Sequence, residues 1–351
     1  MPGADAPVRI LFRADARPDL GGGHIMRCLS LAAALDRRGC EIAFACAPGS
    51  ADLVPALSRS GFAWAEADGL TDCPTPEHWD GKADILFVDL YDSRLADEIA
   101  MRAHCHSLAV IEDLPVRKHD CDLLVDQGFD RRPATYHDRV PPHCRLLLGP
   151  DMVPLRDDFS LKRPRSLGRR RRTTQTRRVL IAMGLTDVRA ISARTYAVTR
   201  SALPDAEIDI VLGPHADSRA ELERCAKTDP RLKIRVDVED MASLMADADL
   251  AIGAGGGTAL ERCVLGLPSL VVILADNQRQ SARAMEKAGA CIALEDGDTL
   301  APRLAACLGA LDAAALQKMS LAAATLCDGE GAHHIAEALM ELHAERRLAA
   351  S

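Results

Sequence analysis

The chain has 351 residues, of which 48% are hydrophobic and 3% are aromatic, and it carries a formal net charge of −8. This length suits two domains of ordinary size, and the apolar fraction is sufficient for packed cores. The acidic balance and the scarcity of aromatic side chains argue against non-specific DNA binding and against a stacking surface for single-stranded nucleic acid.

The predicted elements of the first half are short β-rich runs with helical stretches between them. Strands are expected at residues 8–12, 41–47, 84–89, 107–111, 123–126 and 146–149. Strands that alternate with helices predict a parallel sheet covered on both faces, so the fold class is α/β. We assign residues 1–160 to an amino-terminal, Rossmann-like domain.

A glycine-rich loop follows the first predicted strand. After Arg13 and Asp15 come Gly21, Gly22, Gly23 and His24, and then an amphipathic helix. Glycines allow a tight turn and a close approach to a ligand, and a helix start offers unpaired N–H groups to an anion. A histidine has an ordinary pKa of about 6.5, which suits a general base near neutral pH, although this one could equally be a capping or packing group.

The spacing of this loop excludes two common cofactor motifs. It is not Gly-x-Gly-x-x-Gly, and it lacks the Gly-Lys-Ser/Thr end of a P-loop. Redox cofactors and ATP are therefore disfavoured, and no cofactor is expected.

The alternation breaks at residues 161–178, a basic stretch that contains both proline and glycine. We predict a linker or exposed loop there, because the stretch has no hydrophobic periodicity and no amphipathic partner. The alternation then resumes in a second domain, residues 179–351. Its strands are expected at 179–183, 207–212, 232–236, 250–253, 270–274 and 291–294, with helices at 216–227 and 278–288 and a last helical stretch at 332–348. That last stretch is assigned to the second domain, although it could also cross back to the first.

A second glycine loop, Gly255-Gly256-Gly257-Thr258, opens a helix after a strand of the second domain. Its amides suit a diphosphate, and the binding crevice of an open parallel sheet lies beyond the carboxyl ends of its strands. Glu261 could accept hydrogen bonds from sugar hydroxyls or could simply complement the helix dipole. Asp276, Asn277 and Gln278 could contact sugar substituents, or the first two could cap a helix.

The twelve cysteines are scattered without any Cys-x-x-Cys spacing, so we expect them to be reduced. Residues 104–106 (His-Cys-His) form the only local cluster of ligand types, and adjacent residues cannot converge on one metal in regular structure, so no metal site is predicted. The amino-terminal segment does not have the pattern of a signal peptide, and the longest apolar run, 268–275, is too short to span a bilayer. A cytoplasmic protein with no membrane partner is expected, as a monomer or weak oligomer.

These motifs together resemble the GT-B nucleotide-sugar proteins, and within them the UDP-sugar hydrolases of pseudaminic acid biosynthesis. The phrases that carry the resemblance run in order over most of the chain: residues 12–15, 21–24, 27–29, 88–91, 111–114, 148–150, 155–156, 252–258, 261–263, 265–268 and 275–278. Two stretches depart from the pattern, residues 183–187 (Met-Gly-Leu-Thr-Asp) and the segment 150–154 (Pro-Asp-Met-Val-Pro). The resemblance implies two Rossmann-like domains of GT-B type with an interdomain cleft.

The resemblance also implies roles for residues of this sequence. His24 would be the general base, the second glycine loop would hold the phosphates of uridine diphosphate, and Glu261 would hold its ribose. The full set of expected substrate-binding residues is Arg13, Asp15, Gly22, Gly23, Tyr91, Arg156, Gly255, Gly256, Gly257, Thr258, Glu261, Asp276, Asn277 and Gln278.

The expected reaction is metal-independent hydrolysis of UDP-2,4-diacetamido-2,4,6-trideoxy-β-L-altropyranose to the free sugar and UDP. His24 would remove a proton from a water that attacks the anomeric carbon with inversion, and Asp15 or Asp89 could orient its imidazole. Three alternatives remain: a GT-B glycosyltransferase that uses a UDP-sugar donor, a UDP-sugar 2-epimerase, and a non-catalytic module that binds nucleotide sugars.

Overall fold

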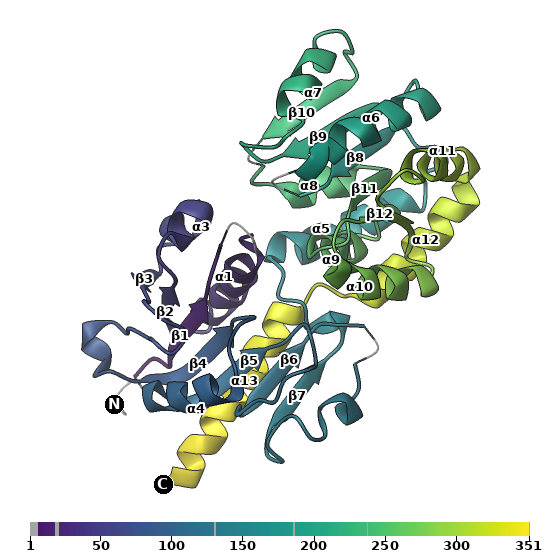
Figure 1. The fold of residues 1–351 in the computed structure, drawn as a ribbon. Coiled ribbons are helices and arrows are strands. Elements are labelled where there is room, and N and C mark those ends of the chain that lie inside the picture. Colours follow the sequence, from purple (N-terminus) through teal and green to yellow (C-terminus); the bar gives the residue numbers. More distant parts are fainter. Residues whose placement is uncertain (1–5, 18–20, 130, 185–186, 237, 351) are drawn as a thin grey trace. The chain divides into compact units, whose positions relative to one another are not determined.

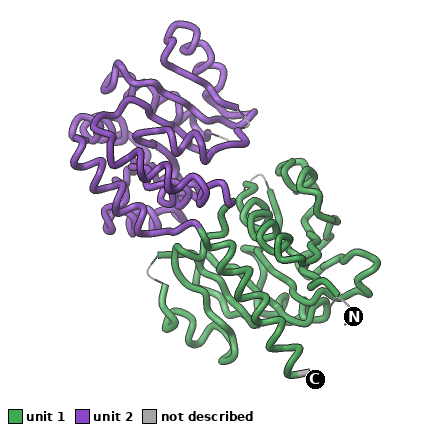
Figure 2. Tube along the Cα trace, turned by 180° about the vertical axis from the view of Figure 1, so that it is seen from behind, with its two compact units in different colours: residues 1–156, 330–351 green, residues 157–329 purple. Residues whose placement is uncertain are grey.

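The computed structural model describes residues 6–17, 21–129, 131–184, 187–236 and 238–350. The chain forms two compact units, which Figure 2 shows in different colours. Unit 1 comprises residues 1–156 and 330–351, and unit 2 comprises residues 157–329. Each unit contains one sheet of parallel strands with helices against it (Figure 1).

Unit 1 is built on a seven-stranded sheet with the order β3-β2-β1-β4-β5-β6-β7. Its strands are β1 (Arg9–Ala14), β2 (Glu41–Cys46), β3 (Ala63–Glu66), β4 (Ala83–Asp89), β5 (Cys105–Ile111), β6 (Leu123–Asp126) and β7 (Arg145–Leu148). Its helices are α1 (Gly23–Asp36), α2 (Ser50–Leu53), α3 (Pro55–Arg59), α4 (Leu95–Met101) and α13 (Gly331–Ala350).

Both faces of this sheet are buried, which explains the continuous apolar runs in its strands. Ile10 and Phe12 of β1 belong to the core that includes side chains of α1 and α13. Leu11 points to the opposite face and packs in a second core with Trp79 and Tyr136. Successive side chains of a strand alternate between faces, so one strand contributes to both cores.

Unit 2 is built on a six-stranded sheet with the order β10-β9-β8-β11-β12-β13. Its strands are β8 (Arg178–Ala182), β9 (Glu207–Leu212), β10 (Leu232–Val236), β11 (Leu250–Ala254), β12 (Ser269–Ile273) and β13 (Cys291–Glu295). Its helices are α5 (Asp157–Arg170), α6 (Ile191–Ala202), α7 (Arg219–Ala226), α8 (Met241–Asp247), α9 (Thr258–Val264), α10 (Asp276–Lys287), α11 (Leu300–Ala310) and α12 (Ala313–Leu326).

The predicted strands of both halves are confirmed, with ends that shift by at most two residues. The exception is β3, which the sequence analysis missed. Its residues, Ala-Trp-Ala-Glu, are mostly exposed at the edge of the sheet. A short edge strand has no buried apolar run to reveal it, and it forms here because β2 offers a pairing edge.

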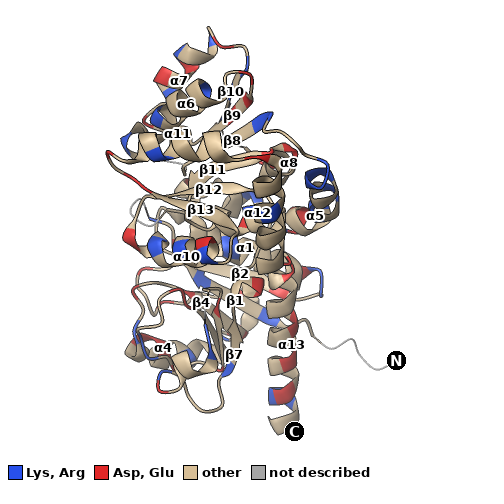
Figure 3. Ribbon diagram, turned by 90° about the vertical axis from the view of Figure 1, so that its right-hand side faces the viewer, with Lys and Arg blue, Asp and Glu red and all other residues tan. Residues whose placement is uncertain are grey.

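The prediction of a linker at residues 161–178 is wrong. Most of that stretch is the carboxyl part of α5, the helix on which Figure 3 shows basic positions in blue. Pro164 lies inside this helix and weakens it locally. Tertiary contacts compensate, because Arg163 and Arg170 donate hydrogen bonds to backbone carbonyls of α8, α12 and the end of α9, and Ser166 Oγ donates to Leu265 O at 2.7 Å.

The assignment of the last helix to the second domain is also wrong. Helix α13 contacts α1 and belongs to unit 1. Ile335 and Leu339 are fully buried in the core of unit 1, and Arg346 donates to Asp122 at 2.6 Å. The apolar face of this helix fits either unit, so only packing decides where it goes.

In each sheet the strand order reverses between two neighbouring strands. Unit 1 reverses between β1 and β4, and unit 2 reverses between β8 and β11. Loops on either side of such a switch point leave the sheet in opposite directions and open a crevice at the carboxyl ends of the strands. Both predicted glycine loops follow strands at these points, since the first follows β1 and the second follows β11.

Among the described residues, no single helix combines the length and the hydropathy needed to cross a membrane. Only the bent pair of segments 300–310 and 313–349, taken together, meets that test of length and composition.

We predict that Leu339→Ala lowers the free energy of unfolding of unit 1 by about 2–5 kcal/mol, because it leaves a cavity in that core. Hydrogen exchange of β1 and α1 should accelerate, while that of β8 and β9 should stay unchanged. Leu321→Ala on α12 is the matched control, because Leu321 is 61% exposed. Faster exchange in unit 2 alone would contradict the assignment of α13 to unit 1.

Candidate active site

Polar side chains gather where β1 and β4 end. His24 lies in the first turn of α1 and is 7% exposed, and Asp89 is the last residue of β4 and is 1% exposed. Nδ1 of His24 lies 2.5 Å from Oδ1 of Asp89. The sequence analysis considered Asp15 and Asp89 as partners of His24, and the structure pairs the imidazole with Asp89.

Asp89 is held in its ionised form. Burial by itself would raise the pKa of Asp89, but the guanidinium of Arg27 and the imidazole of His24 hold it well below its usual range. Arg27 donates from Nε to Oδ2 and from Nη2 to Oδ1 of Asp89, each at 2.6 Å. An ionised carboxylate can only accept hydrogen bonds, so Nδ1 of His24 carries the proton. The lone pair of the neutral imidazole then lies on Nε2, which is the form that a general base needs.

Arg27 and Asp113 were not among the predicted site residues. Nη1 of Arg27 donates to both carboxylate oxygens of Asp113, at 3.0 and 2.8 Å. The hydroxyl of Tyr91 donates to Asp113 at 3.0 Å, and the ring of Tyr91 lies edge-on to that of His24 with centroids 4.4 Å apart. Two signals could have found these residues: Arg27 is three positions after His24 on one helix face, and Asp113 follows the strand beside β4.

His24 lines a small cavity together with Asp15, Arg17, Leu70, Asp89, Leu90, Tyr91 and Asp92. Arg13 is 1% exposed and does not line it. Arg13 instead donates to the carboxylate of Asp15 and to the Gly69 carbonyl, and Asp15 also accepts from the Ala47 amide at 2.7 Å. The structure thus brings the predicted residues Asp15 and Tyr91 to His24 and gives Arg13 the role of holding Asp15.

The two predicted glycines of this loop, Gly22 and Gly23, differ in the space that is available for a Cβ atom. Gly22 caps α1, and a Cβ there would meet a methyl group of Val54 at 2.5 Å. A Cβ on Gly23 would meet nothing within 4 Å. Close packing against Val54 therefore explains Gly22, whereas Gly23 leaves open space at the start of the helix.

Behind Asp113 lies a buried ionic network. His119 sits between two buried carboxylates, with Nδ1 at 2.8 Å from Glu98 and Nε2 at 3.1 Å from Glu112. The contact between His119 Nε2 and Glu112 is an ion pair but does not have the geometry of a hydrogen bond. Glu112 also accepts from the amides of Asp113 and Leu114, at 2.8 and 2.7 Å. This network fixes the loop that presents Asp113 to Arg27.

In unit 2 the second glycine loop follows β11 at the switch point of its sheet. Gly256 and Gly257 are exposed, and Gly255 is buried against Gln278 and Val271. The Gly255 amide donates to Val272 O at 3.2 Å, whereas in the described part of the chain the amides of Gly256 and Gly257 donate to no protein acceptor. These amides are therefore available to an anionic ligand.

The other predicted residues of unit 2 lie near this loop or at its side. Gln278 accepts a hydrogen bond from the Leu274 amide at 3.1 Å, and a Cβ on Gly256 would lie 3.9 Å from its Nε2. Asp276 and Asn277 are exposed in the first turn of α10, and Glu261 is half-buried in α9 beside Thr258. The structure therefore groups Gln278 with the glycine loop.

Arg156, a predicted binding residue, and the stretch 183–187, which departs from the family pattern, do not belong to the two sites described above. Arg156 ends the first of the two segments that make up unit 1, and it is not among the residues that line the His24 cavity. In the departing stretch 183–187, Leu185 and Thr186 lie outside the described residues, and Asp187 is fully buried and accepts from the Ser192 amide at 2.8 Å. Asp187 thus stabilises the entry to α6.

Unit 2 also has a cavity that does not lie at the glycine loop. It has a volume of about 500 Å³ and lies at the amino ends of β8 and β9, beside Arg177, Arg178 and Glu207. Substrates of open parallel sheets bind at the opposite, carboxyl edge. The glycine loop, at the carboxyl edge, is therefore the candidate ligand site of unit 2.

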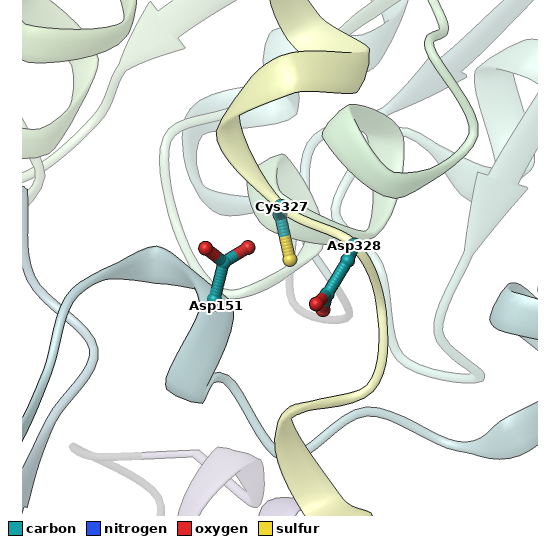
Figure 4. Close-up of side chains that lie close together, drawn as sticks. All are labelled: Asp151, Cys327 and Asp328. Atoms are coloured by element: carbon teal, nitrogen blue, oxygen red, sulfur yellow. The ribbon is translucent and has the colours of Figure 1, made fainter. Parts of the chain in front are cut away.

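Figure 4 shows Asp151, Cys327 and Asp328, which are ligand types for a metal. Asp151 belongs to unit 1, and the other two belong to unit 2. The three residues therefore do not make up a metal site within one unit.

Two parallel sheets, each with a polar or glycine-rich loop at its switch point, define the GT-B fold. The comparisons agree with this class. The model of the glycosyltransferase family 28 C-terminal domain matches residues 196–339. The MurG protein of Acinetobacter baumannii aligns with a TM-score of 0.70 at 15% identity, over 95% of this chain and 100% of that one.

Two curated relatives match most of this chain. The chain is 23% identical to the UDP-2,4-diacetamido-2,4,6-trideoxy-beta-L-altropyranose hydrolase of Campylobacter jejuni, over 80% of this chain and 97% of that protein. It is 27% identical to the uncharacterized protein MJ1062 of Methanocaldococcus jannaschii, over 78% of this chain and 57% of that protein. These matches support a nucleotide-sugar-related protein of the GT-B superfamily.

The His119 network predicts a pH dependence of stability. Burial by itself would lower the pKa of His119, but Glu112 and Glu98 raise it to about 9, above the ordinary value of about 6.5. Its charge therefore stabilises the fold fully below about pH 6.5, and this contribution is lost as the pH rises through about 9.

We expect the unfolding temperature of unit 1 to fall between about pH 6.5 and pH 9.5, and to fall less in His119→Gln. Thermal unfolding at several pH values measures this difference. His137→Gln is the control, because His137 is exposed. Equal slopes for the wild type and His119→Gln would refute the assignment.

Proposed function

We propose that this protein hydrolyses a UDP-sugar, UDP-2,4-diacetamido-2,4,6-trideoxy-β-L-altropyranose, to the free sugar and UDP in pseudaminic acid biosynthesis. The observation that carries the proposal is the pair of His24 and Asp89, which has Nδ1 at 2.5 Å from Oδ1 and lines a small cavity. The similarity to the Campylobacter jejuni hydrolase supports the choice of substrate.

In the proposed reaction, Nε2 of His24 takes a proton from a water molecule while the water oxygen attacks the anomeric carbon. A C–O bond forms to that carbon, and the bond to the UDP oxygen breaks on the opposite face, so the configuration inverts. Asp89 keeps the imidazole in place and stabilises the imidazolium that forms. The negative charge that develops on the diphosphate is stabilised by the free amides of Gly256 and Gly257. This sequence of steps uses no divalent metal and no other cofactor.

The remaining predicted residues are proposed as binding groups for the same substrate. Glu261 would accept hydrogen bonds from the ribose. Asp276, Asn277 and Gln278 would contact the sugar or the phosphates, and Tyr91 and Arg156 would contact the substrate from unit 1. Asp276 and Asn277 are exposed and directly precede Gln278, which lies against the glycine loop, and this supports that part of the proposal.

The second candidate function is transfer of the sugar from the same donor to an acceptor other than water. The match of residues 196–339 to a glycosyltransferase domain and the likeness to MurG favour it. An epimerase and a non-catalytic binding module are the further alternatives. These functions share a nucleotide site and differ in what reaches the anomeric carbon.

The experiment that separates them is turnover of the UDP-sugar in ¹⁸O-labelled water without an added acceptor, followed by mass analysis of both products. Label in the free sugar supports hydrolysis at the anomeric carbon. Label only in UDP would mean attack at phosphorus and would remove the proposed mechanism. Release that depends on an acceptor would favour the transferase, an unreleased sugar inverted at C2 would favour the epimerase, and binding without turnover would favour the module.

We predict that His24→Ala lowers kcat on the order of 10²–10⁴-fold while UDP affinity is retained, because only the base is removed. Asp89→Asn should also lower kcat, since the imidazole loses the charge that orients it. Steady-state kinetics and calorimetric titration with UDP measure both effects. The exposed His137→Ala is the control, and normal turnover by His24→Ala would eliminate His24 as the base.

A further inference from the structure

Arg262 is a buried cation beneath the second glycine loop. It lies on α9 and is 1% exposed. Its guanidinium reaches both ends of the loop, because Nη2 donates to the Ala254 carbonyl at 2.8 Å and Nη1 donates to the Thr258 hydroxyl at 3.2 Å. Arg262 thus connects the residue that ends β11 with the residue that begins α9.

Gly253 makes this arrangement possible. A Cβ at that position would lie 2.6 Å from Nη1 of Arg262 and 2.8 Å from the Ala182 carbonyl. Real Cβ atoms essentially never make contacts under 3.0 Å, so a larger residue at position 253 would displace the guanidinium. Strand β11 therefore has a glycine where a packed side chain would otherwise stand, and the guanidinium of Arg262 occupies that space.

In the part of the chain that the structure describes, no carboxylate neutralises Arg262. Within the described residues it takes part in no ion pair, and its Nε has no hydrogen-bond partner. Burial lowers the pKa of Arg262, and weaker attraction to Cys263, Cys291 and Glu261 does not offset this. An isolated buried cation is costly, and proteins normally pair it.

Arg170 shows how the same unit treats a buried arginine with a purely structural role. It is 4% exposed and donates to three backbone carbonyls, those of Met245, Ala248 and Leu265. These bonds dock α5 onto its neighbours. Arg262 makes fewer bonds, and both of them go to the loop that exposes free amides.

We propose that Arg262 is a positioning residue for the diphosphate of a nucleotide ligand, holding the loop from Ala254 to Thr258 in shape and supplying a positive charge beneath it. This inference rests on the proposed function, and it names the charged diphosphate as the group that the site recognises. An anion on the Gly256 and Gly257 amides completes the charge balance that the protein alone leaves open. Arg262 itself stays buried and acts through the loop.

The test is calorimetric titration with uridine, UMP and UDP, which share one base and differ in phosphate charge. The variants are Arg262→Met, Arg262→Gln, which keeps a hydrogen-bonding amide without the charge, and Arg262→Lys, which keeps the charge. We expect the first two to weaken UDP binding about tenfold or more, with a much smaller effect on uridine. Arg262→Lys should restore most of the UDP affinity. In turnover of the UDP-sugar, the loss should be in KM more than in kcat.

Arg170→Met is the matched control, because it removes a buried arginine of the same unit that does not touch the loop. It should lower the unfolding temperature without changing the ratio of UDP to uridine affinity. If the Arg262 variants bind UDP as tightly as the wild type, or lose UDP and uridine affinity equally, the inference is overturned and the proposed function stands. A wild-type protein that binds neither UDP nor UMP would overturn both. If Arg262→Met does not fold, Arg262→Gln and Arg262→Lys give the same comparison of charge.

Discussion

The ionised carboxylate of Asp89 is the constraint on which the organisation of unit 1 depends. A charge that is 99% buried must be compensated, and two groups of one helix do so. His24 and Arg27 lie three residues apart on α1, so their contacts with Asp89 fix the first turn of that helix against the end of β4. The same contacts orient the imidazole toward the cavity.

The compensation extends outward from Asp89 through further ion pairs and hydrogen bonds. Arg27 shares its guanidinium with Asp113, and the loop that carries Asp113 is held by Glu112, whose partners include His119. Removal of one member of such a chain leaves another charge buried and unpaired, which is strongly destabilising. These contacts hold the loop in place, which favours the role of base that we propose for His24, because a base must be held in one orientation.

The charged and polar groups at the switch point of unit 2 differ from those of unit 1. Unit 2 has exposed amides and one unpaired buried cation there, where unit 1 has paired carboxylates. A buried carboxylate suits the orientation of an imidazole that accepts a proton. Free backbone amides and a nearby cation suit the binding of a diphosphate. Two sheets of the same topology thus provide different chemistry, because the difference lies in the loops at their carboxyl edges.

The sequence by itself determined the two parallel sheets, every strand except β3, and the positions of both glycine loops, because apolar runs and glycine patterns are local signals. It also indicated His24 with Asp15 or Asp89 as its partner, and the family resemblance added Tyr91. It did not reveal that the arginines of α5 bind carbonyls, that α13 returns to unit 1, or that Arg27 and Asp113 complete the site. Those outcomes depend on which buried surfaces and charges meet in space, and only the tertiary structure decided them. The sequence around a charge or an apolar face does not show which distant residues it will contact.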